Sequence, residues 1–458
     1  MSTTSRPRPP SVEQVLVRLR LDDSQADRDP DALADAARSV VADERRRLAE
    51  GAEPTSLADL AEAAGDALRS LERVAIGTTI NATGVIVHTT LGRAPWPRAA
   101  IEAAAAASGE YLLLELDRAS GRRGARFRAA EDHLIALTGA AAVLVTNNNA
   151  AAVALAVGLA GRGRGVAVSR GELVEIGGGV RSPEIVRRAG AKLVEVGTTN
   201  RTRVADYEAA LADGSARLVL RVHPSNFRQS GFIETPDPAA LAELAHRHGA
   251  IVVDDLGSGA LLPTERFGLA HEPTPRERLA AGSDLVTFSG DKLIGGPQAG
   301  LVVGRADLIG RLRRDPLARA MRPDKATLAA VAATLGLYRA GRATTEIPVW
   351  RMVAAPADGL RTRAEAIAAA VAARDGAQPA EVIATEATVG GGSLPGETLP
   401  SFGVAVASGS AEALLAALRR GEPAIVGRSE AGRVSRDLRT VDVARDDELA
   451  AAIAAALA

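Results

Sequence analysis

The chain has 458 residues, a formal net charge of −1 and no cysteine. The absence of cysteine excludes disulfide bonds, thiolate catalysis and cysteine-bound metals. Because the net charge is close to zero, the chain as a whole has no electrostatic attraction to nucleic acid or membrane surfaces. The first 14 residues lack the apolar core of a signal peptide and the apolar runs are too short to span a bilayer, so we expect a cytoplasmic protein without a membrane segment.

Residues 1–75 are predicted to form a small helical domain. Three segments carry apolar residues at helical spacing, and Ser11, Asp31 and Ser56 are the expected N-caps. This part contains more acidic than basic side chains and no aromatic residue. It therefore lacks the basic and stacking residues that are typical of a general RNA-binding surface.

The next segment, residues 76–97, shows no periodicity and is expected to link the helical domain to the main body. From residue 98 to 355 the chain alternates helical segments with short, continuously apolar runs such as AAVLVT, GVAVS, AIVVDD and SDLVTFS. Such runs are typical of an α/β fold with a mostly parallel sheet that helices cover. Residues 356–458 are predicted to be a smaller α/β domain.

Four polar clusters directly follow predicted strands: VTNNN, RVHPSN, VVDDLGSG and TFSGDK. In parallel sheets of this kind, ligands bind beyond the carboxyl ends of the strands. We therefore expect these clusters to meet at one edge of the sheet and to form the site. The six histidines are scattered, and no spacing among them indicates a metal site.

Lysine is rare in this chain, although arginine is abundant. Lysine and arginine together number 55, but only Lys192, Lys292 and Lys325 are lysines. Arginine stays protonated at ordinary pH, whereas lysine can lose its proton and act as a nucleophile or base. Lys192 precedes an apolar strand and is expected at the surface. Lys325 lies near a helix start, where a structural role explains it. Lys292, between an apolar strand and a glycine pair, is the predicted catalytic amine.

A catalytic lysine in this setting indicates pyridoxal phosphate. This cofactor needs a lysine for a Schiff base, a carboxylate beside the pyridine nitrogen, and donors for its phosphate. Asp255, at the end of IVVDD, is the predicted carboxylate, with its neighbour Asp254 as the alternative.

Further polar residues are candidates for holding the cofactor. Asn147, Asn148 and Asn149 lie at a predicted helix N-terminus, where exposed N–H groups favour an anion such as phosphate. Ser289 precedes the lysine by three residues and can add a hydroxyl to the phosphate. Asn226 is expected near the phenolic oxygen of the cofactor.

Three arginines are candidates for binding an anionic substrate. Arg319 and Arg322 are three residues apart, so on a helix they would share a face and grip one oxyanion. Arg93, in HTTLGRAPW, is the third.

Many of these stretches together resemble one family. INATGVIVHTTLGRAPW, RGARFR, VTNNNAAAVAL, SRGELVEIGGGVRSPEI, GTTNRT, HPSNF, DLGSG, FSGDKLIGGPQAG, LARAMRPDK, IPVWRM and GGGSLPGETLPS resemble the bacterial L-seryl-tRNA(Sec) selenium transferases, or selenocysteine synthases. The resemblance covers the chain in the family's motif order. It implies a fold-type I pyridoxal-phosphate-dependent transferase that converts L-seryl-tRNA(Sec) to L-selenocysteinyl-tRNA(Sec) with selenium from selenophosphate.

The resemblance also implies roles for single residues and for the assembly. Lys292 matches the family's Schiff-base lysine and Asp291 the acidic residue before it. Arg93, Arg319 and Arg322 fall on positions that bind the phosphate-like anion of the selenium donor. The family's N-terminal domain recognises the tRNA, and its bacterial members form large rings of dimers, so we expect a homo-oligomer, with a decamer as the expected size.

Two alternatives remain open at this point. The chain could be a related pyridoxal-phosphate-dependent lyase that acts on a free small amino acid or amino sugar acid, although such a substrate needs no tRNA-binding extension. A non-enzymatic tRNA-binding or assembly protein would be expected to have lost the lysine or its carboxylate partner, and both are present.

Overall fold

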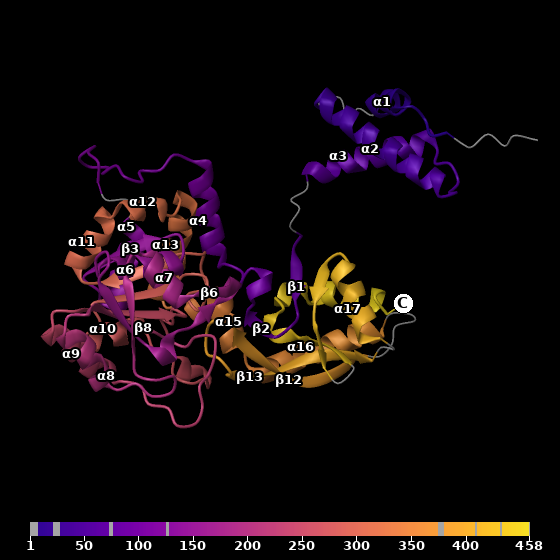
Figure 1. Ribbon diagram of the computed structural model, residues 1–458. Coiled ribbons are helices and arrows are strands. Elements are labelled where there is room, and N and C mark those ends of the chain that lie inside the picture. Colours follow the sequence, from indigo (N-terminus) through magenta and orange to yellow (C-terminus); the bar gives the residue numbers. More distant parts are fainter. Residues whose placement is uncertain are drawn as a thin grey trace, which may run out of the picture. The chain divides into compact units, whose positions relative to one another are not determined.

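The structure is a computed structural model that describes residues 8–21, 28–72, 77–124, 128–373, 380–407, 410–430 and 433–457. The contacts between residues divide the chain into two compact units, Met1–Thr78 and Thr79–Ala458 (Figure 1). Each unit has a hydrophobic core of its own.

The first unit packs three helices in its described residues: α1 (Val12–Arg20), α2 (Pro30–Ala49) and α3 (Leu57–Glu72). Their apolar faces close a core that includes Val15 and Leu68. This agrees with the periodicity of the sequence, since each helix presents one apolar stripe to the other two.

The helix starts in this unit follow the capping rules, with one difference. Ser11 caps α1 in a capping box, and the Ser56 hydroxyl accepts a hydrogen bond from the Asp59 N–H at 3.1 Å. In α2 the N-cap is Asp29 and not the expected Asp31. The reason is Pro30, which takes the first helical position because it has no N–H to satisfy and its φ already suits a helix.

The second unit is built around a sheet with the strand order β3-β11-β10-β9-β8-β4-β7 among the described residues. The strands β10, β9, β8, β4 and β7 run parallel, whereas β11 is antiparallel to both of its neighbours. The bounds are β3 (Ala142–Thr146), β4 (Gly165–Ser169), β7 (Lys192–Val196), β8 (Ala216–Val222), β9 (Ile251–Gly257), β10 (Leu285–Ser289) and β11 (Gly300–Gly304).

Helices cover both faces of this sheet, which explains why its strands are apolar on both sides. In β8, Leu218 and Leu220 pack in one cluster with α6, α7 and α11, whereas Val219 packs in another with α8 and α9. The helices are α4 (Arg98–Gly109), α5 (Arg128–Thr138), α6 (Asn149–Gly158), α7 (Ser182–Arg188), α8 (Val204–Ala212), α9 (Pro238–Arg247), α10 (Pro275–Ala280), α11 (Ala306–Arg314), α12 (Pro316–Ala320), α13 (Lys325–Arg339), α14 (Ala343–Glu346) and α15 (Pro348–Ala354). The predicted α/β class with a mostly parallel sheet is confirmed.

A smaller sheet follows in the chain and includes part of the segment expected to be a linker. The strand β1 (Thr79–Asn81) pairs with β14 (Ala424–Val426), and β2 (Val85–Val87) pairs with β12 (Glu381–Gly390). Residues 79–87 therefore contribute β1 to a separate two-stranded sheet with β14, and β2 to the small sheet, roles that three-residue strands do not reveal by periodicity.

The order of this small sheet is β15-β16-β13-β12-β2 among the described residues. Its helices pack on it around a separate core that includes Leu360, Val404 and Ile453. The remaining elements are β5 (Glu175–Ile176), β6 (Val180–Arg181), α16 (Ala357–Ala372), β13 (Thr398–Ala407), α17 (Ala411–Arg420), β15 (Arg428–Glu430), β16 (Arg433–Asp437) and α18 (Asp446–Ala455).

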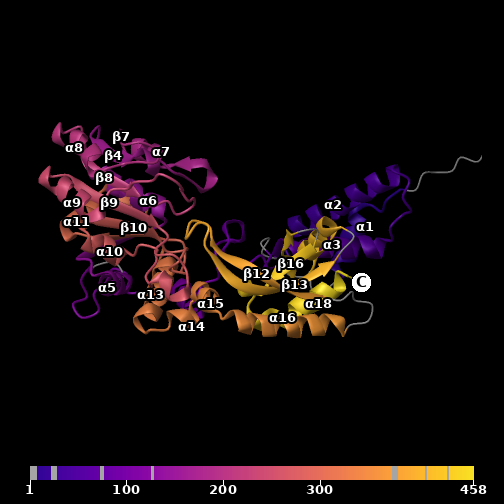
Figure 2. The same cartoon turned by 90° about the horizontal axis from the view of Figure 1, so that it is seen from below.

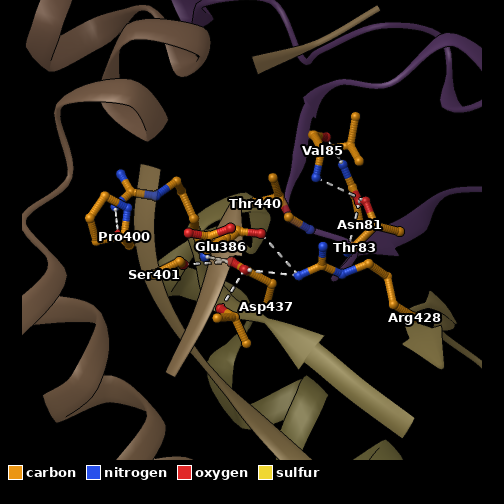
Figure 3. Close-up of polar contacts among 12 residues, drawn as sticks. Asn81, Thr83, Val85, Glu386, Pro400, Ser401, Arg428, Asp437 and Thr440 are labelled. Carbon is orange, nitrogen blue, oxygen red and sulfur yellow. Dashed lines mark hydrogen bonds and ion pairs between the residues drawn. The ribbon is translucent and has the colours of Figure 1, made fainter. Parts of the chain in front are cut away.

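A buried carboxylate, Asp437, ties the strands of the small sheet together (Figure 3). It accepts hydrogen bonds from Thr385 Oγ1 on β12 at 2.6 Å, from Ser401 Oγ on β13 at 2.7 Å and from the Arg439 N–H at 2.9 Å. Arg428 Nη2 lies 3.5 Å from its Oδ2. Because a buried charge is stable only when it is paired and hydrogen-bonded, this cluster fixes β12 and β13 relative to β15 and β16.

Candidate active site

A cavity of about 820 Å³ lies in the second unit, where β8, β9 and β10 end. Polar residues from these strand ends meet there, as the strand-end rule predicts. Eight of the residues that the sequence suggested line this one cavity: Arg93, Asn148, Asn149, Asn226, Asp255, Ser289, Asp291 and Lys292.

Lys292 lies in the turn after β10, and its surroundings favour the uncharged amine. Burial lowers the pKa of Lys292, and the positive charge of Arg93 acts in the same direction. The negative charges of Asp255, Asp291 and Glu272 act against this shift, but burial dominates. A larger share of this amine is therefore unprotonated at neutral pH than in a solvated lysine, which suits a nucleophile and base.

Asp255, near the end of β9, is held in place by two donors. Asn149 Nδ2 donates to its Oδ1 at 2.8 Å, and Thr287 Oγ1 donates to the same oxygen at 3.0 Å. Burial raises the pKa of Asp255, whereas these hydrogen bonds and the positive charge of Lys292 lower it. A carboxylate in this position is stabilised further by any cation that binds beside it.

The alternative carboxylate, Asp254, does not reach this cavity. It is buried, accepts a hydrogen bond from Ser283 Oγ, and lines a second cavity of about 280 Å³. Successive side chains of a strand point to opposite faces, so Asp254 and Asp255 cannot both face Lys292.

The start of helix α6 has the form expected of an anion-binding site. Asn148 is the N-cap, and its side chain accepts from the Ala151 N–H at 2.9 Å. The N–H groups of Asn149 and Ala150 have no partner among the described residues. These groups are suited to a phosphate, whereas the side chain of Asn149 binds Asp255 instead.

Two other predicted residues also line the cavity. Ser289 is the last residue of β10 and is buried. Asn226 follows β8, and its Nδ2 donates to the Glu175 carbonyl at 2.7 Å. One N–H of the Asn226 amide is thus used within the chain, which leaves its second N–H and its Oδ1 for a ligand.

Arg93 is held beside the lysine by its neighbours. Its Nε lies 3.4 Å from Asp291 Oδ2, and its Nη1 lies 3.4 Å from the Gly391 carbonyl. Its φ of +79° is unusual for a residue with a side chain, and such strain is found mainly at functional sites.

The structure does not bring Arg319 and Arg322 to this cavity within one chain. Both line another cavity of about 530 Å³, where Arg322 forms an ion pair with Glu115. Helix α12 ends at Ala320, so the expected shared helix face does not form. Both side chains still line one cavity, but it is not the cavity that Lys292 lines.

Sequence reasoning missed several residues of the cavity wall. His223 follows β8 directly, and its Nε2 lies 3.4 Å from Oε2 of the buried Glu272. The strand-end rule that selected Asn226 would also have selected His223. A loop of the small sheet, residues 390–396, forms another part of the wall. Its glycine-rich sequence was visible, but its contact with Lys292 depends on the folding of distant segments.

The donor set fits pyridoxal phosphate. A buried amine with a lowered pKa, a fixed carboxylate and an open helix N-terminus line one cavity, and these are the groups that the aldehyde, the pyridine nitrogen and the phosphate require. The described residues contain no group of three or more histidine, aspartate or glutamate side chains that could hold a metal ion. No helix in the described ranges is long and apolar enough to cross a membrane.

The structure and the sequence of the chain were compared with those of known proteins. Among solved structures, the chain resembles the D-glucosaminate-6-phosphate ammonia-lyase with a TM-score of 0.59 and 22% identity, over 85% of this chain and 98% of the other. This likeness supports the fold and no more.

Curated proteins of known name share a much higher sequence identity with this chain than that structure does. The L-seryl-tRNA(Sec) selenium transferase of Moorella thermoacetica is 43% identical over 98% of this chain and 96% of its own length. That of Rhizobium meliloti is 43% identical over 94% of this chain and 93% of its own length, and that of Carboxydothermus hydrogenoformans is 46% identical over 79% and 78%. The sequence profile of the family described as "L-seryl-tRNA selenium transferase" matches residues 79–442. The family that the motifs indicated is confirmed, and the chain belongs to the L-seryl-tRNA selenium transferases.

Proposed function

We propose that the protein converts L-seryl-tRNA(Sec) to L-selenocysteinyl-tRNA(Sec), with pyridoxal phosphate as cofactor and selenophosphate as selenium donor. The observation that carries this proposal is the cavity that joins Lys292, Asp255 and the start of α6 in a chain of this family. The cofactor, when bound, withdraws electrons from the α-carbon of the seryl group.

Residues of the chain transfer the proton and bind the cofactor. The Lys292 amine takes the proton from the α-carbon, which its lowered pKa permits near neutral pH. Asp255, held by Asn149 and Thr287, supplies the carboxylate for the pyridine nitrogen. The open N–H groups at the start of α6 and the hydroxyl of Ser289 hold the phosphate.

The selenium donor is a phosphate-like anion and needs cations. Arg93 is the arginine that lines the cavity in the described part of the chain, with Asp291 orienting its guanidinium. Arg319 and Arg322, which lie elsewhere in this chain, can join the site only from another subunit. The homo-oligomer implied by the resemblance, with a decamer as the expected ring, is part of this proposal, as are a cytoplasmic location and recognition of the tRNA by residues 1–75.

Replacement of the catalytic amine tests the proposal. Lys292→Ala should abolish the formation of selenocysteinyl-tRNA and change the absorption spectrum of the bound cofactor, while binding of tRNA persists. Lys192→Ala is the matched control, because Lys192 is an exposed lysine on β7. Unchanged turnover in Lys292→Ala would refute the assignment. Turnover of a free amino acid or amino sugar acid, without any effect of seryl-tRNA(Sec), would favour the small-substrate lyase.

A further inference from the structure

Asn149 belongs to two parts of the candidate site at once. It is the first residue of α6, and its N–H is one of the two at this helix start that have no partner among the described residues. Its side chain serves the carboxylate, since Nδ2 donates to Asp255 Oδ1 at 2.8 Å. Helix α6 lies beside β9 and β10, the strands that carry Asp255 and Thr287 (Figure 2). One residue therefore offers a main-chain donor to a phosphate and a side-chain donor to the carboxylate.

The hydrogen bonds of Asp255 distinguish its two carboxylate oxygens. Asn149 Nδ2 and Thr287 Oγ1 both donate to Oδ1, at 2.8 and 3.0 Å. No side chain in the described ranges donates to Oδ2. The two donors come from different elements, so the carboxylate is held between the start of a helix and a strand. Oδ2 is thus the oxygen that remains for the pyridine nitrogen.

The two donors differ in their other contacts. Thr287 is fully buried and is not among the residues that line the cavity, and its main chain is paired with both β9 and β11. Asn149 lines the cavity, and its Oδ1 is buried without a partner in the part of the chain that the structure describes. Hydrogen bonds therefore position the Asn149 amide through Nδ2 alone, and the rest of its position depends on the helix start that carries it.

An anion at the start of α6 can act on the carboxylate through Asn149. A phosphate that binds the open N–H groups fixes the backbone of Asn149, and this backbone carries the amide that holds Asp255. When one ligand group orders a residue that a second group also needs, the two bind with positive coupling. Thr287 provides no such link, because its strand pairing fixes it with or without an anion.

We propose that Asn149 is a positioning residue that couples the phosphate end of the cofactor site to the carboxylate at its ring end. The proposal rests on the proposed function, because it takes the anion at α6 and the partner of Asp255 to be parts of one cofactor. It gives Asn149 a second role beside its contact with the phosphate. A ligand without the phosphate should leave Asp255 less well positioned, although every side chain at the ring end is present.

A cycle of two ligands and two proteins tests the coupling. Pyridoxal phosphate and pyridoxal, which lacks the phosphate, are titrated to saturation into the cofactor-free wild type and into Asn149→Ala. Binding is read from the change in visible absorption. The variant keeps the main-chain N–H groups of α6 and loses only the amide. If the two ends of the site were independent, it would weaken the binding of both ligands by the same factor.

We expect Asn149→Ala to bind pyridoxal phosphate at least about tenfold more weakly than the wild type, the effect of a lost charge-assisted hydrogen bond. The loss for pyridoxal should be at least about threefold smaller, within the range of couplings measured in one hydrogen-bond network. An equal loss for the two ligands, or a larger loss for pyridoxal, would overturn the proposal.

Thr287→Val is the matched control, because Thr287 donates to the same oxygen of Asp255 and valine has nearly the same shape as threonine. It should weaken the binding of both ligands by the same factor. A fall in the ratio of the two affinities as large as that in Asn149→Ala would mean that any loosening of Asp255 has this effect. That result would overturn the assignment to Asn149.

The melting temperature of each cofactor-free variant checks that it is folded. Asn149→Ala removes an unpartnered buried oxygen together with the hydrogen bond, so the fold is expected to persist. Asn149→Ser, with a shorter polar side chain, repeats the cycle if alanine is not tolerated, and the same difference between the two ligands is expected.

Failure of this inference is distinguishable from failure of the proposed function. If the wild type forms selenocysteinyl-tRNA but the two ligands lose equally in Asn149→Ala, only the coupling is refuted. If the cycle shows the coupling but the wild type forms no selenocysteinyl-tRNA, the proposed function is refuted while the positioning role of Asn149 stands.

Discussion

Lys292 and Asp255 show opposite pKa shifts with the same leading cause. Burial disfavours the charged form of each, so it lowers the pKa of the amine and raises that of the carboxyl group. Their mutual attraction opposes both shifts. A cofactor that reacts with the amine and places a protonated ring nitrogen beside the carboxylate would relieve both costs. The site is thus destabilising on its own and suited to a ligand.

Replacing Lys292 with methionine should stabilise the cofactor-free protein. Between the lowered pKa of Lys292 in the folded state and its ordinary value of 10.5, the unfolded state binds more protons, so stability rises with pH across that window. Below the window the full cost of the buried charge is present. Lys292→Met removes this cost, and we expect a gain of about 0.5–2 kcal/mol at pH 7 that shrinks as the pH approaches 10.5.

Thermal unfolding of cofactor-free protein at several pH values measures this difference. Lys192→Met, at an exposed lysine, should change neither the stability nor its pH dependence. A lower melting temperature of Lys292→Met at pH 7 would contradict the argument.

Asp255→Asn should separate function from stability. The raised pKa of Asp255 means that the folded state holds its proton above the ordinary value of 3.8, so stability falls as the pH rises through the window above 3.8. Asparagine keeps an acceptor for Asn149 and Thr287 but has no charge. At pH 7 the cofactor-free variant should therefore be at least as stable as the wild type, while turnover falls about 10²–10³-fold, as for the loss of a fixed electrostatic partner.

The comparison needs two measurements on the same preparation: the melting temperature without cofactor, and the rate of selenocysteinyl-tRNA formation with it. Wild-type turnover in Asp255→Asn would show that the carboxylate does not face the cofactor. A large loss of stability at pH 7 would show that its hydrogen bonds outweigh the cost of the buried charge.

The elements around the site were predictable to different degrees. The strands β3, β8, β9 and β10 are mostly apolar runs, and their ends carry the residues that the strand-end rule selected. The strand β11 is short, is bounded by glycines and is antiparallel to its neighbours, a direction that no local pattern encodes. The loop 390–396 joins β12 and β13 of the small sheet and lines a cavity at the end of the large one, so its role depended on contacts remote in sequence.

Gly300, the first residue of β11, should be intolerant of any side chain. A Cβ atom there would lie 2.1 Å from the Asn148 carbonyl oxygen and 2.3 Å from Thr146 Oγ1. These contacts involve the end of β3 and the start of α6, which lines the cavity. Gly300→Ala should destabilise the protein by more than about 3 kcal/mol, since backbone must move to accommodate the methyl group.

Gly310→Ala is the matched comparison. Gly310 lies within α11, and its Cβ atom would meet only Arg314 Nη1, at 3.6 Å. Alanine is the better helix former, so this variant should gain up to about 1 kcal/mol. Chemical denaturation of both variants measures the difference, and equal effects at the two positions would contradict the packing described for β11.

The division of the molecule into two units is expected to divide its functions as well. The family profile matches residues 79–442, which fall within the second unit and include the whole cavity. The first unit has a core of its own but contains only 78 residues, a size at which a single core is marginally stable. The chemistry is thus expected to remain when the first unit is removed, whereas selection of the tRNA is expected to be lost.

A fragment of residues 79–458 tests this separation. It should bind pyridoxal phosphate with the visible absorption and affinity of the full chain, because all residues that line the cavity belong to it. It should lose its preference for seryl-tRNA(Sec) over other seryl-tRNAs, and competition between these tRNAs in a binding assay measures that preference. A fragment that keeps the preference would place tRNA recognition in the second unit. A fragment that folds but binds no cofactor would show that the first unit supports the site.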